Sequence, residues 1–360
     1  MIILGIETSC DETSVALIKG NKKNENVQLL SNIIASSLLL HAKSGGIIPE
    51  IAAREQIKYI IPVFEKALEE SKLQKENIDA VAVTVGPGLI GSLLVGVETA
   101  KTISYIWKKP IIPVNHLIGH IYANFISKIN NSKLIINNSA VPEFPAIALI
   151  VSGGHTDLIL MERHGRIKWL GGTRDDAAGE AFDKIGRLLN LPYPGGPHIE
   201  RLAKDIKKDL YSFPRPLIES DDFDFSFSGL KTAVFREITA IKNLGNKTIA
   251  NISYSTQEAI FEVIVKKTLM AAQKYNAKSV LLGGGVAANN ELRARFEFEI
   301  RNLSTQMRDP ATAGKLEISF FVPEKRLCTD NAAMIATAAF YNYKSIPWQQ
   351  IEANPALYFD

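Results

Sequence analysis

The chain has 360 residues, of which 46% are hydrophobic and 22% are charged, and its formal net charge is +3. This composition is typical of globular proteins, and the length suits two domains better than a single core. The weak positive charge neither requires nor excludes nucleic acid, so any such contact would come from a local patch. Two cysteines, Cys10 and Cys328, are too few for a disulfide framework, which favours a reducing compartment such as the cytoplasm.

The N-terminal part of the chain predicts an alternation of strands and helices. Apolar runs and helical apolar spacing place two strands, a helix, a strand and a helix over residues 2–6, 15–18, 50–72, 79–85 and 89–106. A turn of hydroxyl and carboxylate side chains at residues 7–14 joins the first two strands. Uncharged residues 80–97 approach the length of a membrane span, but their glycines favour a strand, a tight turn and a buried helix. We therefore expect no membrane association.

The same order of elements begins again near residue 146. Two strands, a helix, a strand and a helix are expected over residues 146–151, 158–161, 256–275, 278–282 and about 289–300. This repetition predicts an internal duplication, with two α/β domains that face a cleft. The first domain would comprise residues 1–127 with about 330–360, and the second domain residues 146–329.

Three polar segments stand apart from the duplicated pattern. The Asn-rich stretch 128–145 is expected to be a surface connection between the domains. Residues 21–28, 128–143 and 301–318 look like insertions, because they are polar and rich in Asn and Lys. A last helix is expected after Asp330 and would pack on the first domain.

Two histidines four residues apart, His116 and His120, would lie on one face of a helix, one turn apart. Two imidazoles so placed can bind one metal ion, or they can be ordinary helix residues, one buried and one solvated. A zinc peptidase would need a glutamate directly after the first histidine as general base, but Leu117 stands there. The pair therefore fits a metal that orients an anionic substrate better than one that generates hydroxide.

Two glycine-rich turns are candidates for anion binding. In Ser152-Gly153-Gly154-His155-Thr156, successive glycines allow backbone N–H groups to turn toward an anion, although a simple hairpin turn has the same composition. Residues 283–289 form a second turn that leads into a helix N-terminus, a position that favours phosphate. Residues 86–91 match the dinucleotide pattern Gly-x-Gly-x-x-Gly, but no acidic residue follows at the required distance, which favours a tight turn with close packing.

Acidic residues offer further candidate ligands. Asp176, Glu180 and Asp183 would share one face of a helix, where they could bind a metal or ribose hydroxyls, or be solvated beside basic neighbours. Asp330 precedes an apolar run, so it is either a helix N-cap or the carboxylate that completes the histidine pair.

Ten segments of the chain closely resemble the tRNA threonylcarbamoyladenosine-forming transferases, in the TsaD form of bacteria and organelles. They follow one another in order over residues 5–14, 41–50, 86–93, 116–120, 152–156, 175–183, 194–197, 225–231, 284–289 and 328–331. The resemblance implies two duplicated ribonuclease-H-like domains of the actin/sugar-kinase/heat-shock ATPase (ASKHA) fold around a central cleft. It also implies transfer of threonylcarbamoyl from L-threonylcarbamoyladenylate to the exocyclic amine of the adenosine beside the anticodon, in tRNAs reading codons that begin with A.

The resemblance also assigns site residues. It places the ligands of one divalent metal ion, iron or zinc with iron favoured, at His116, His120 and Asp330. It places the adenylate-binding positions at Ile150, Val151, Ser152, Gly153, Gly154, Asp183, Gly196 and Asn289. The polar loop of the first domain adds Asp11 and Glu12, and we expect one of them to orient or deprotonate the attacking amine. Hydrogen bonding within the hairpin turn is the alternative role of these two acids.

The expected partners follow from the same resemblance. They are tRNA, the adenylate donor made by a separate synthase, a TsaB-type paralogue that pairs through the first domain, and a TsaE-type ATPase. Candidate tRNA phosphate contacts are Lys204, Lys207, Lys208, Arg293 and Arg295. Two other functions remain open on the sequence: a metal-dependent glycoprotein endopeptidase and a nucleotide-binding or kinase module of the same fold.

Overall fold

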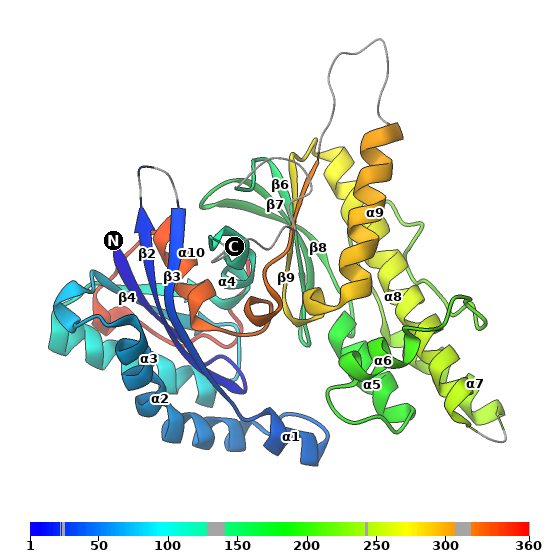
Figure 1. Ribbon diagram of the computed structural model, residues 1–360, viewed down its shortest axis with the longest axis horizontal. Coiled ribbons are helices and arrows are strands. Elements are labelled where there is room, and N and C mark those ends of the chain that lie inside the picture. The colour runs from blue at the N-terminus through cyan, green and yellow to red at the C-terminus, as the bar shows by residue number, and fades with distance from the viewer. Residues whose placement is uncertain (22, 24–25, 128–140, 242–243, 307–317, 360) are drawn as a thin grey trace, which may run out of the picture. The chain divides into compact units, whose positions relative to one another are not determined.

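The computed structural model describes residues 1–21, 23, 26–127, 141–241, 244–306 and 318–359 (Figure 1). The chain divides into two units, the first formed by Met1–Lys133 with Pro323–Asp360 and the second by Leu134–Val322. Among the helices of the described ranges, none has the length and apolarity that crossing a membrane requires.

The first unit contains a five-stranded sheet with the order β3-β2-β1-β4-β5. Its strands, in chain order, are β1 (Ile2–Glu7), β2 (Glu12–Asn21), β3 (Asn26–Ser36), β4 (Ala80–Gly86) and β5 (Ile111–Asn115). The first three strands pair antiparallel, whereas β1, β4 and β5 run parallel to one another. The carboxyl ends of β1, β4 and β5 therefore meet at one edge of the sheet.

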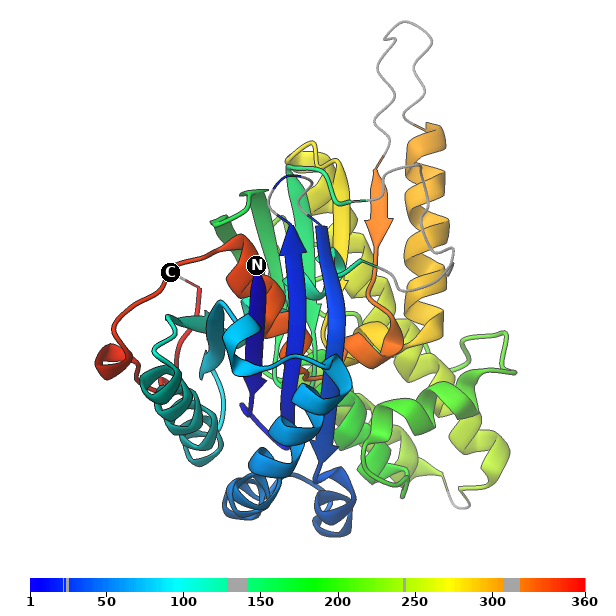
Figure 2. The same ribbon diagram turned by 60° about the vertical axis from the view of Figure 1, so that its left-hand side comes forward.

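Helices cover both faces of this sheet (Figure 2). They are α1 (Leu38–Ser44), α2 (Pro49–Ser71), α3 (Ile90–Trp107), α4 (His116–Tyr122) and α10 (Ala332–Tyr341). Side chains of a strand alternate between faces, so Leu4 and Ile6 pack in a core with residues of α2 and α3. Gly5 points the other way, where a Cβ atom would lie 2.4 Å from the carbonyl oxygen of Ala332 in α10. The last helix therefore packs on the first unit, as predicted.

The second unit repeats the sheet topology of the first, with the order β10-β9-β6-β7-β8. The strands are β6 (Ala146–Val151), β7 (Thr156–Arg163), β8 (Arg166–Gly172), β9 (Ser279–Gly283) and β10 (Ser319–Phe321). Read from the opposite edge, the third, second, first, fourth and fifth strands of each unit occupy corresponding places, with matching parallel and antiparallel pairs. This correspondence confirms the predicted duplication.

In the described part of the second unit, four helices lie between β8 and β9 in the chain, and a fifth lies between β9 and β10. They are α5 (Ala178–Leu188), α6 (Gly195–Ala203), α7 (Ser228–Ala240), α8 (Asn246–Lys274) and α9 (Asn290–Gln306). Helix α8 begins ten residues before the predicted start at 256, because Asn and Ser residues weaken the helical pattern there although Ile252 and Ser253 are buried.

Parts of two of the expected insertions lie within strands or a helix. The described part of 21–28 belongs to a hairpin, since β2 extends to Asn21 and β3 begins at Asn26, with Val27 and Leu29 buried. Asn26 and Gln28 are solvent-facing positions of a strand whose buried side chains alternate with them. Likewise, residues 301–306 belong to α9, whereas 307–317 and 128–140 lie outside the described residues.

Candidate functional site

The histidine pair lies at the carboxyl edge of the first sheet. Strand β5 ends at Asn115, whose side chain accepts hydrogen bonds from the N–H groups of Leu117 and Ile118 and so caps α4. His116 and His120 follow one turn apart on this helix, with ring centroids 4.7 Å apart. Both side chains are buried, so the alternative of one buried and one solvated histidine is wrong.

Asp330 completes the cluster. Its Oδ1 atom lies 3.2 Å from Nε2 of His120 and 3.5 Å from Nε2 of His116. One candidate ligand atom from each residue lies within 4.8 Å of the others. The expected alternative, that Asp330 is the N-cap of the last helix, is wrong: Asn331 accepts the hydrogen bond from Met334 N instead. The carboxylate of Asp330 is thus directed to the histidines rather than to the helix.

A second carboxylate orients His116. Oε2 of Glu7 lies 3.2 Å from Nδ1 of His116, and the hydroxyl of Ser9 lies 3.1 Å from the same nitrogen. Glu7 itself accepts hydrogen bonds from the Ser9 N–H at 2.6 Å and the Thr84 hydroxyl at 2.5 Å. A carboxylate behind a histidine fixes the ring and leaves the other nitrogen for a metal, which is the usual arrangement around metal-binding histidines.

The donor set fits a divalent metal ion. Neither ring nitrogen of the buried His120 has a hydrogen-bond partner among the described residues. A buried polar atom without a partner costs free energy, and a cation held by His116, His120 and Asp330 would remove that cost at Nε2 of His120. Two neutral histidines and one carboxylate also match the ligands that zinc and non-haem iron accept.

Metal binding is expected to depend on pH through His116. Burial alone would lower the pKa of His116, but the carboxylates of Asp330 and Glu7 outweigh it and raise the pKa to about 9 in the metal-free chain. Because the metal needs the neutral ring, affinity measured by competition with a chelator should rise about tenfold per pH unit and level off near pH 9. In Glu7→Gln the metal affinity should level off at a lower pH, because the Glu7 carboxylate that raises the pKa of His116 is gone. Affinity independent of pH between 6 and 9 would contradict this prediction.

The same shift affects the metal-free fold. A histidine whose pKa is raised on folding stabilises the folded state most below its ordinary pKa of 6.5. That contribution is lost as the pH rises through about 9. Metal-free protein should therefore melt at a lower temperature at pH 9 than at pH 6.5, and this difference should shrink when metal is bound.

The two candidate catalytic acids lie near Asp330 of the histidine and aspartate cluster. Glu12 is the first residue of β2, and its Oε1 accepts a hydrogen bond from the Ser36 hydroxyl. Burial, reinforced by the carboxylates of Asp330 and Asp11, holds the pKa of Glu12 well above its usual range. Burial and the same acids also raise the pKa of the Cys10 thiol, which keeps it neutral and excludes a thiolate nucleophile there.

The second unit gathers most of the candidate adenylate positions at one sheet edge. Strands β6 and β9 run parallel with Ile150 opposite Gly283, so the turns that follow both strands lie side by side. Val151 ends β6, and Gly284 has a φ of +92°, with its missing Cβ only 2.4 Å from the Val151 carbonyl oxygen. The carboxyl ends of adjacent parallel strands are where α/β proteins commonly bind ligands.

The Ser152-Gly153-Gly154 turn has two different sides. Ser152 is held by the protein: its hydroxyl accepts a hydrogen bond from His155 N, and its carbonyl oxygen accepts one from Gly179 N. In contrast, a Cβ atom at Gly153 or Gly154 would meet nothing within 4 Å. The glycines border open space, as expected of a turn whose backbone receives a ligand.

The remaining adenylate candidates hold helix ends. Asp183 accepts a hydrogen bond from Gly195 N at 2.7 Å; burial raises its pKa, although the N–H groups of Gly195 and Gly196 counteract this rise. Oδ1 of Asn289 accepts from the N–H groups of Glu291 and Leu292 and so caps α9. The sequence did not predict these structural roles.

Asp176, Glu180 and Asp183 do not form one acidic face of α5, as the sequence suggested they could. Helix α5 begins only at Ala178, after Asp176. Lys184 forms ion pairs with Asp176 at 2.7 Å and with Glu180 at 2.8 Å, as the solvated alternative expected. Asp183 contacts α6 instead.

The glycines of residues 86–91 serve packing, as favoured by the sequence. Gly86 and Gly88 have φ values of +153° and +157°. A Cβ atom at Gly88 would lie 2.5 Å from the Ser9 carbonyl oxygen, so glycine allows the turn after β4 to approach the loop after β1.

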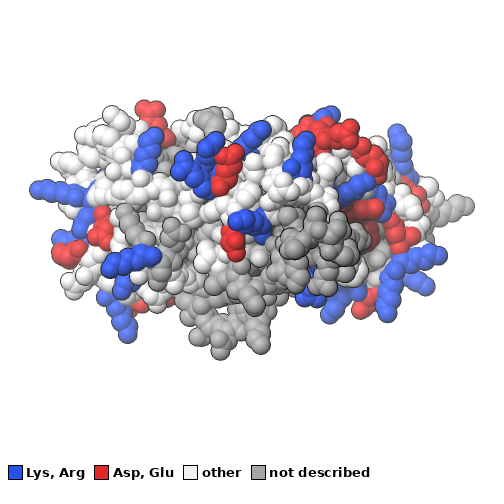
Figure 3. All heavy atoms as spheres, turned by 90° about the horizontal axis from the view of Figure 1, so that it is seen from above, with Lys and Arg blue, Asp and Glu red and all other residues white. Residues whose placement is uncertain are grey.

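Of the candidate phosphate contacts, three lysines are exposed, whereas two arginines interact with other groups of the protein. Lys204, Lys207 and Lys208 are exposed after α6. Arg293 is buried and donates to the Ala287 carbonyl oxygen, and Arg295 pairs with Glu258, so both arginines make contacts within the protein. The face in Figure 3 shows basic and acidic side chains interspersed among the described residues rather than one basic stripe.

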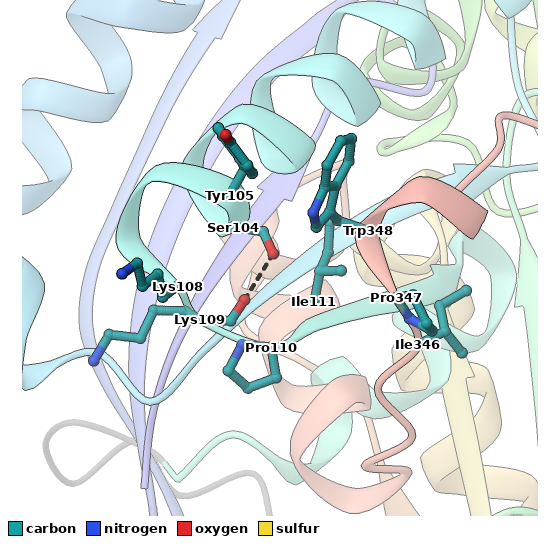
Figure 4. A pocket seen from close by; sticks show the side chains of 9 residues that line it. All are labelled: Ser104, Tyr105, Lys108, Lys109, Pro110, Ile111, Ile346, Pro347 and Trp348. Atoms are coloured by element: carbon teal, nitrogen blue, oxygen red, sulfur yellow. Dashed lines mark hydrogen bonds between the residues drawn. The ribbon is translucent and has the colours of Figure 1, made fainter.

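A surface pocket of about 420 Å³ lies away from all candidate site residues (Figure 4). Its lining includes the edge-to-face pair of Tyr105 and Trp348, with ring centroids 5.3 Å apart. The pocket borders Ile111 at the start of β5, whereas the histidines follow the opposite end of that strand. It is therefore separate from the metal cluster.

The chain has relatives among known proteins that match it over nearly its whole length. The family model described as TsaD, tRNA N6-adenosine threonylcarbamoyltransferase, matches residues 28–337. A tRNA N6-adenosine threonylcarbamoyltransferase of Bacillus thuringiensis (strain Al Hakam) is 44% identical over 99% of this chain and 96% of its own length. The protein of that name from Moorella thermoacetica is 46% identical over 95% of this chain and 92% of its own length.

Solved structures agree on the fold. HypF of T. kodakarensis superposes with a TM-score of 0.58 at 14% identity, over 95% of this chain and 47% of that protein. Component A of (R)-2-hydroxyglutaryl-CoA dehydratase from Acidaminococcus fermentans gives a TM-score of 0.51 at 14% identity, over 95% and 98%. These likenesses confirm the α/β fold of the ASKHA type. With the near full-length sequence identity, they show that the chain belongs to the tRNA N6-adenosine threonylcarbamoyltransferases, a family of acyltransferases that modify tRNA.

Proposed function

We propose that the chain transfers the threonylcarbamoyl group of L-threonylcarbamoyladenylate to the exocyclic amine of the adenosine next to the anticodon. The product is threonylcarbamoyladenosine (t6A) in tRNAs that read codons beginning with A, and AMP is released. The proposal rests on the 44% and 46% sequence identity, over nearly the whole chain, to proteins named for this activity. The histidine and aspartate cluster of the first unit and the open glycine turn of the second unit support it.

The adenylate is assigned to the second unit. The N–H groups of Gly153 and Gly154 would receive its phosphate, because the turn borders open space and has no side chain there. The other adenylate positions are those that end β6 or surround its turn, namely Ile150, Val151, Ser152, Asp183, Gly196 and Asn289.

The metal is assigned to the first unit, with His116, His120 and Asp330 as ligands. When bound, a divalent ion such as iron or zinc supplies positive charge for the oxygens of the donor. Glu7 keeps the His116 ring in place through Nδ1. The chain between the histidines has no carboxylate that could serve as the base of a metallopeptidase, which favours acyl transfer over proteolysis.

The reaction requires one nucleophilic substitution at the carbamoyl carbon. The amine nitrogen forms a bond to that carbon, the bond between the carbon and the phosphate oxygen breaks, and AMP leaves with the electron pair. The nitrogen loses one proton. We propose that Asp11 or Glu12 accepts this proton or orients the amine. The loop that carries both acids lies beside Asp330.

Partner proteins are proposed on the exposed apolar surface of the first unit. Ile57 and Ile61 lie one turn apart on α2 and are 64% and 54% exposed, and Ile90 and Leu94 are similarly spaced on the adjoining α3. A surface of this kind suits a helical face of another protein, which we assign to a TsaB-type paralogue. A TsaE-type ATPase and a cytoplasmic location are proposed from the family and its tRNA substrate.

Alanine substitutions at two glycines should separate donor binding from folding. Gly153→Ala adds a methyl group to open space, so it should keep the melting temperature and raise KM for the adenylate about tenfold or more. Gly284→Ala forces a side chain into a φ of +92° against Val151, so it should lower stability by more than 1 kcal/mol. Both effects can be measured by thermal unfolding and initial rates. Unchanged KM in Gly153→Ala would contradict the assignment of the phosphate to this turn.

The function is tested by incubating the chain with partner proteins, the adenylate and an unmodified tRNA, then detecting t6A by mass spectrometry after digestion to nucleosides. Product in the complete mixture and none without the chain would support the transferase. Chelator-sensitive cleavage of a glycoprotein, lost in His116→Ala, would favour the endopeptidase instead. ATP-dependent phosphorylation of a small substrate without t6A would favour the kinase-like module.

A further inference from the structure

A single side chain forms hydrogen bonds with three main-chain carbonyl oxygens of the loop that carries Asp11 and Glu12. Gln56 lies on α2 and is 1% exposed. Its Nε2 atom donates to three main-chain carbonyl oxygens of the loop, those of Thr8 at 3.2 Å, Cys10 at 2.9 Å and Glu12 at 3.2 Å. Three acceptors around one nitrogen also fix the orientation of the amide, because its oxygen in that place would repel all three.

The loop's other carbonyl oxygens are held from neighbouring elements. That of Ser9 accepts a hydrogen bond from Leu89 N at 2.8 Å, and that of Asp11 accepts from the N–H and hydroxyl of Ser37. The Cys10 oxygen also receives the Ser92 hydroxyl at 3.1 Å. Gln56 differs from these groups because one nitrogen atom binds three alternate residues, so its loss would remove a hydrogen bond from the carbonyl oxygens of Thr8, Cys10 and Glu12 at once.

This loop connects two parts of the site. It begins beside Glu7 and Ser9, whose side chains contact Nδ1 of His116, and ends at the acids assigned to the amine. Three carbonyl oxygens that converge on one point repel one another unless a donor lies between them. The donor at Gln56 therefore favours the one loop conformation in which these groups have the described positions.

We propose that Gln56 is a positioning residue for the transfer reaction, acting through the main chain of residues 8–12. The assignment rests on the proposed function, since the loop's acids are placed there. It does not require Gln56 to contact either substrate. Its consequence is that Gln56 variants should affect the rate of transfer more than substrate binding, because the loop's groups act on the reacting amine rather than on the adenylate.

The test compares three variants with a matched control on the same helix. Gln56→Met removes the donor and keeps the side-chain length, Gln56→Glu replaces the donating nitrogen with an oxygen, and Gln56→His supplies an N–H donor again. Val63→Ala is the control: Val63 is buried on α2 in the apolar core, so its loss weakens the helix packing without touching the loop.

Gln56→Met and Gln56→Glu should lower kcat about 10- to 100-fold with KM for the adenylate within about twofold. Gln56→His should recover part of kcat. Hydrogen exchange of the peptide covering residues 7–13 should be faster in Gln56→Met than in wild type, but unchanged in Val63→Ala. Equal kcat in Gln56→Met and Val63→Ala at matched melting temperature would overturn the proposal. The exchange measurement is independent of activity, so unchanged exchange in Gln56→Met would overturn it even if the chain formed no t6A.

Discussion

Replacing His120 by alanine is expected to abolish metal binding and t6A formation together. His120 has no other hydrogen-bond partner among the described residues, so the substitution removes one ligand while breaking no network. Loss of a residue behind a ligand costs about 10- to 100-fold in metal affinity, and loss of the ligand itself should cost more. Metal content measured by elemental analysis and t6A measured by mass spectrometry should fall in parallel.

His198→Ala provides the matched control for this experiment. His198 also lies on a helix, α6, where its ring forms an exposed hydrogen bond with Arg201 and is not part of the histidine and aspartate cluster. This variant should retain metal and activity within about twofold, as expected for a surface substitution. Full activity in His120→Ala after removal of bound metal would show that the cluster has no part in the reaction.

Asp222→Ala is expected to destabilise the second unit more than Lys267→Met. The Lys267 side chain on α8 is 1% exposed and donates to the Ser220 hydroxyl, the Asp222 carbonyl oxygen and Asp222 Oδ1. Removing the carboxylate leaves a buried ammonium without a counter-charge, at a cost of about 3 kcal/mol. Removing the ammonium leaves Asp222, which is 41% exposed and can be hydrated, so the loss should be about 1 kcal/mol.

The contact between Lys267 and Asp222 should also affect how the free energy of unfolding depends on pH. Hydrogen bonds from Ser220 and Lys267 lower the pKa of Asp222 to about 2. A depressed carboxyl pKa adds stability above the ordinary value of 3.8 and loses it as the pH falls through about 2. Wild type should therefore lose more stability than Lys267→Met between pH 5 and 2 in urea titrations. Equal losses, or a larger effect of Lys267→Met at neutral pH, would contradict this account.

Much of the fold could be predicted because its strands are short apolar runs with clear boundaries. Residues 146–151 form a strand over the predicted range, since both faces of β6 are buried and every residue is apolar. Strand β3 could not be recognised in the same way. It is a sheet edge with polar residues at alternate positions, so its first residues resemble an insertion.

The candidate ligands were visible in the sequence, but the groups that support them were not. His116 and His120 lie four residues apart, a spacing that reflects helical geometry. Glu7, Ser9 and Gln56 lie between 60 and 109 positions from His116, and their convergence depends on the parallel pairing of β1, β4 and β5. Similarly, only the structure shows that Asn331 caps the last helix and leaves Asp330 to the histidines.

The most direct test of the proposed activity follows the acyl group itself. Adenylate carrying a radiolabelled threonyl carbon is incubated with the chain, its partner proteins and tRNA, and both products are measured over time. The account predicts that label enters the tRNA as t6A and that one AMP is released for each nucleoside formed. Release of AMP with all label remaining in free threonine, in a mixture where the Bacillus thuringiensis relative labels tRNA, would contradict it.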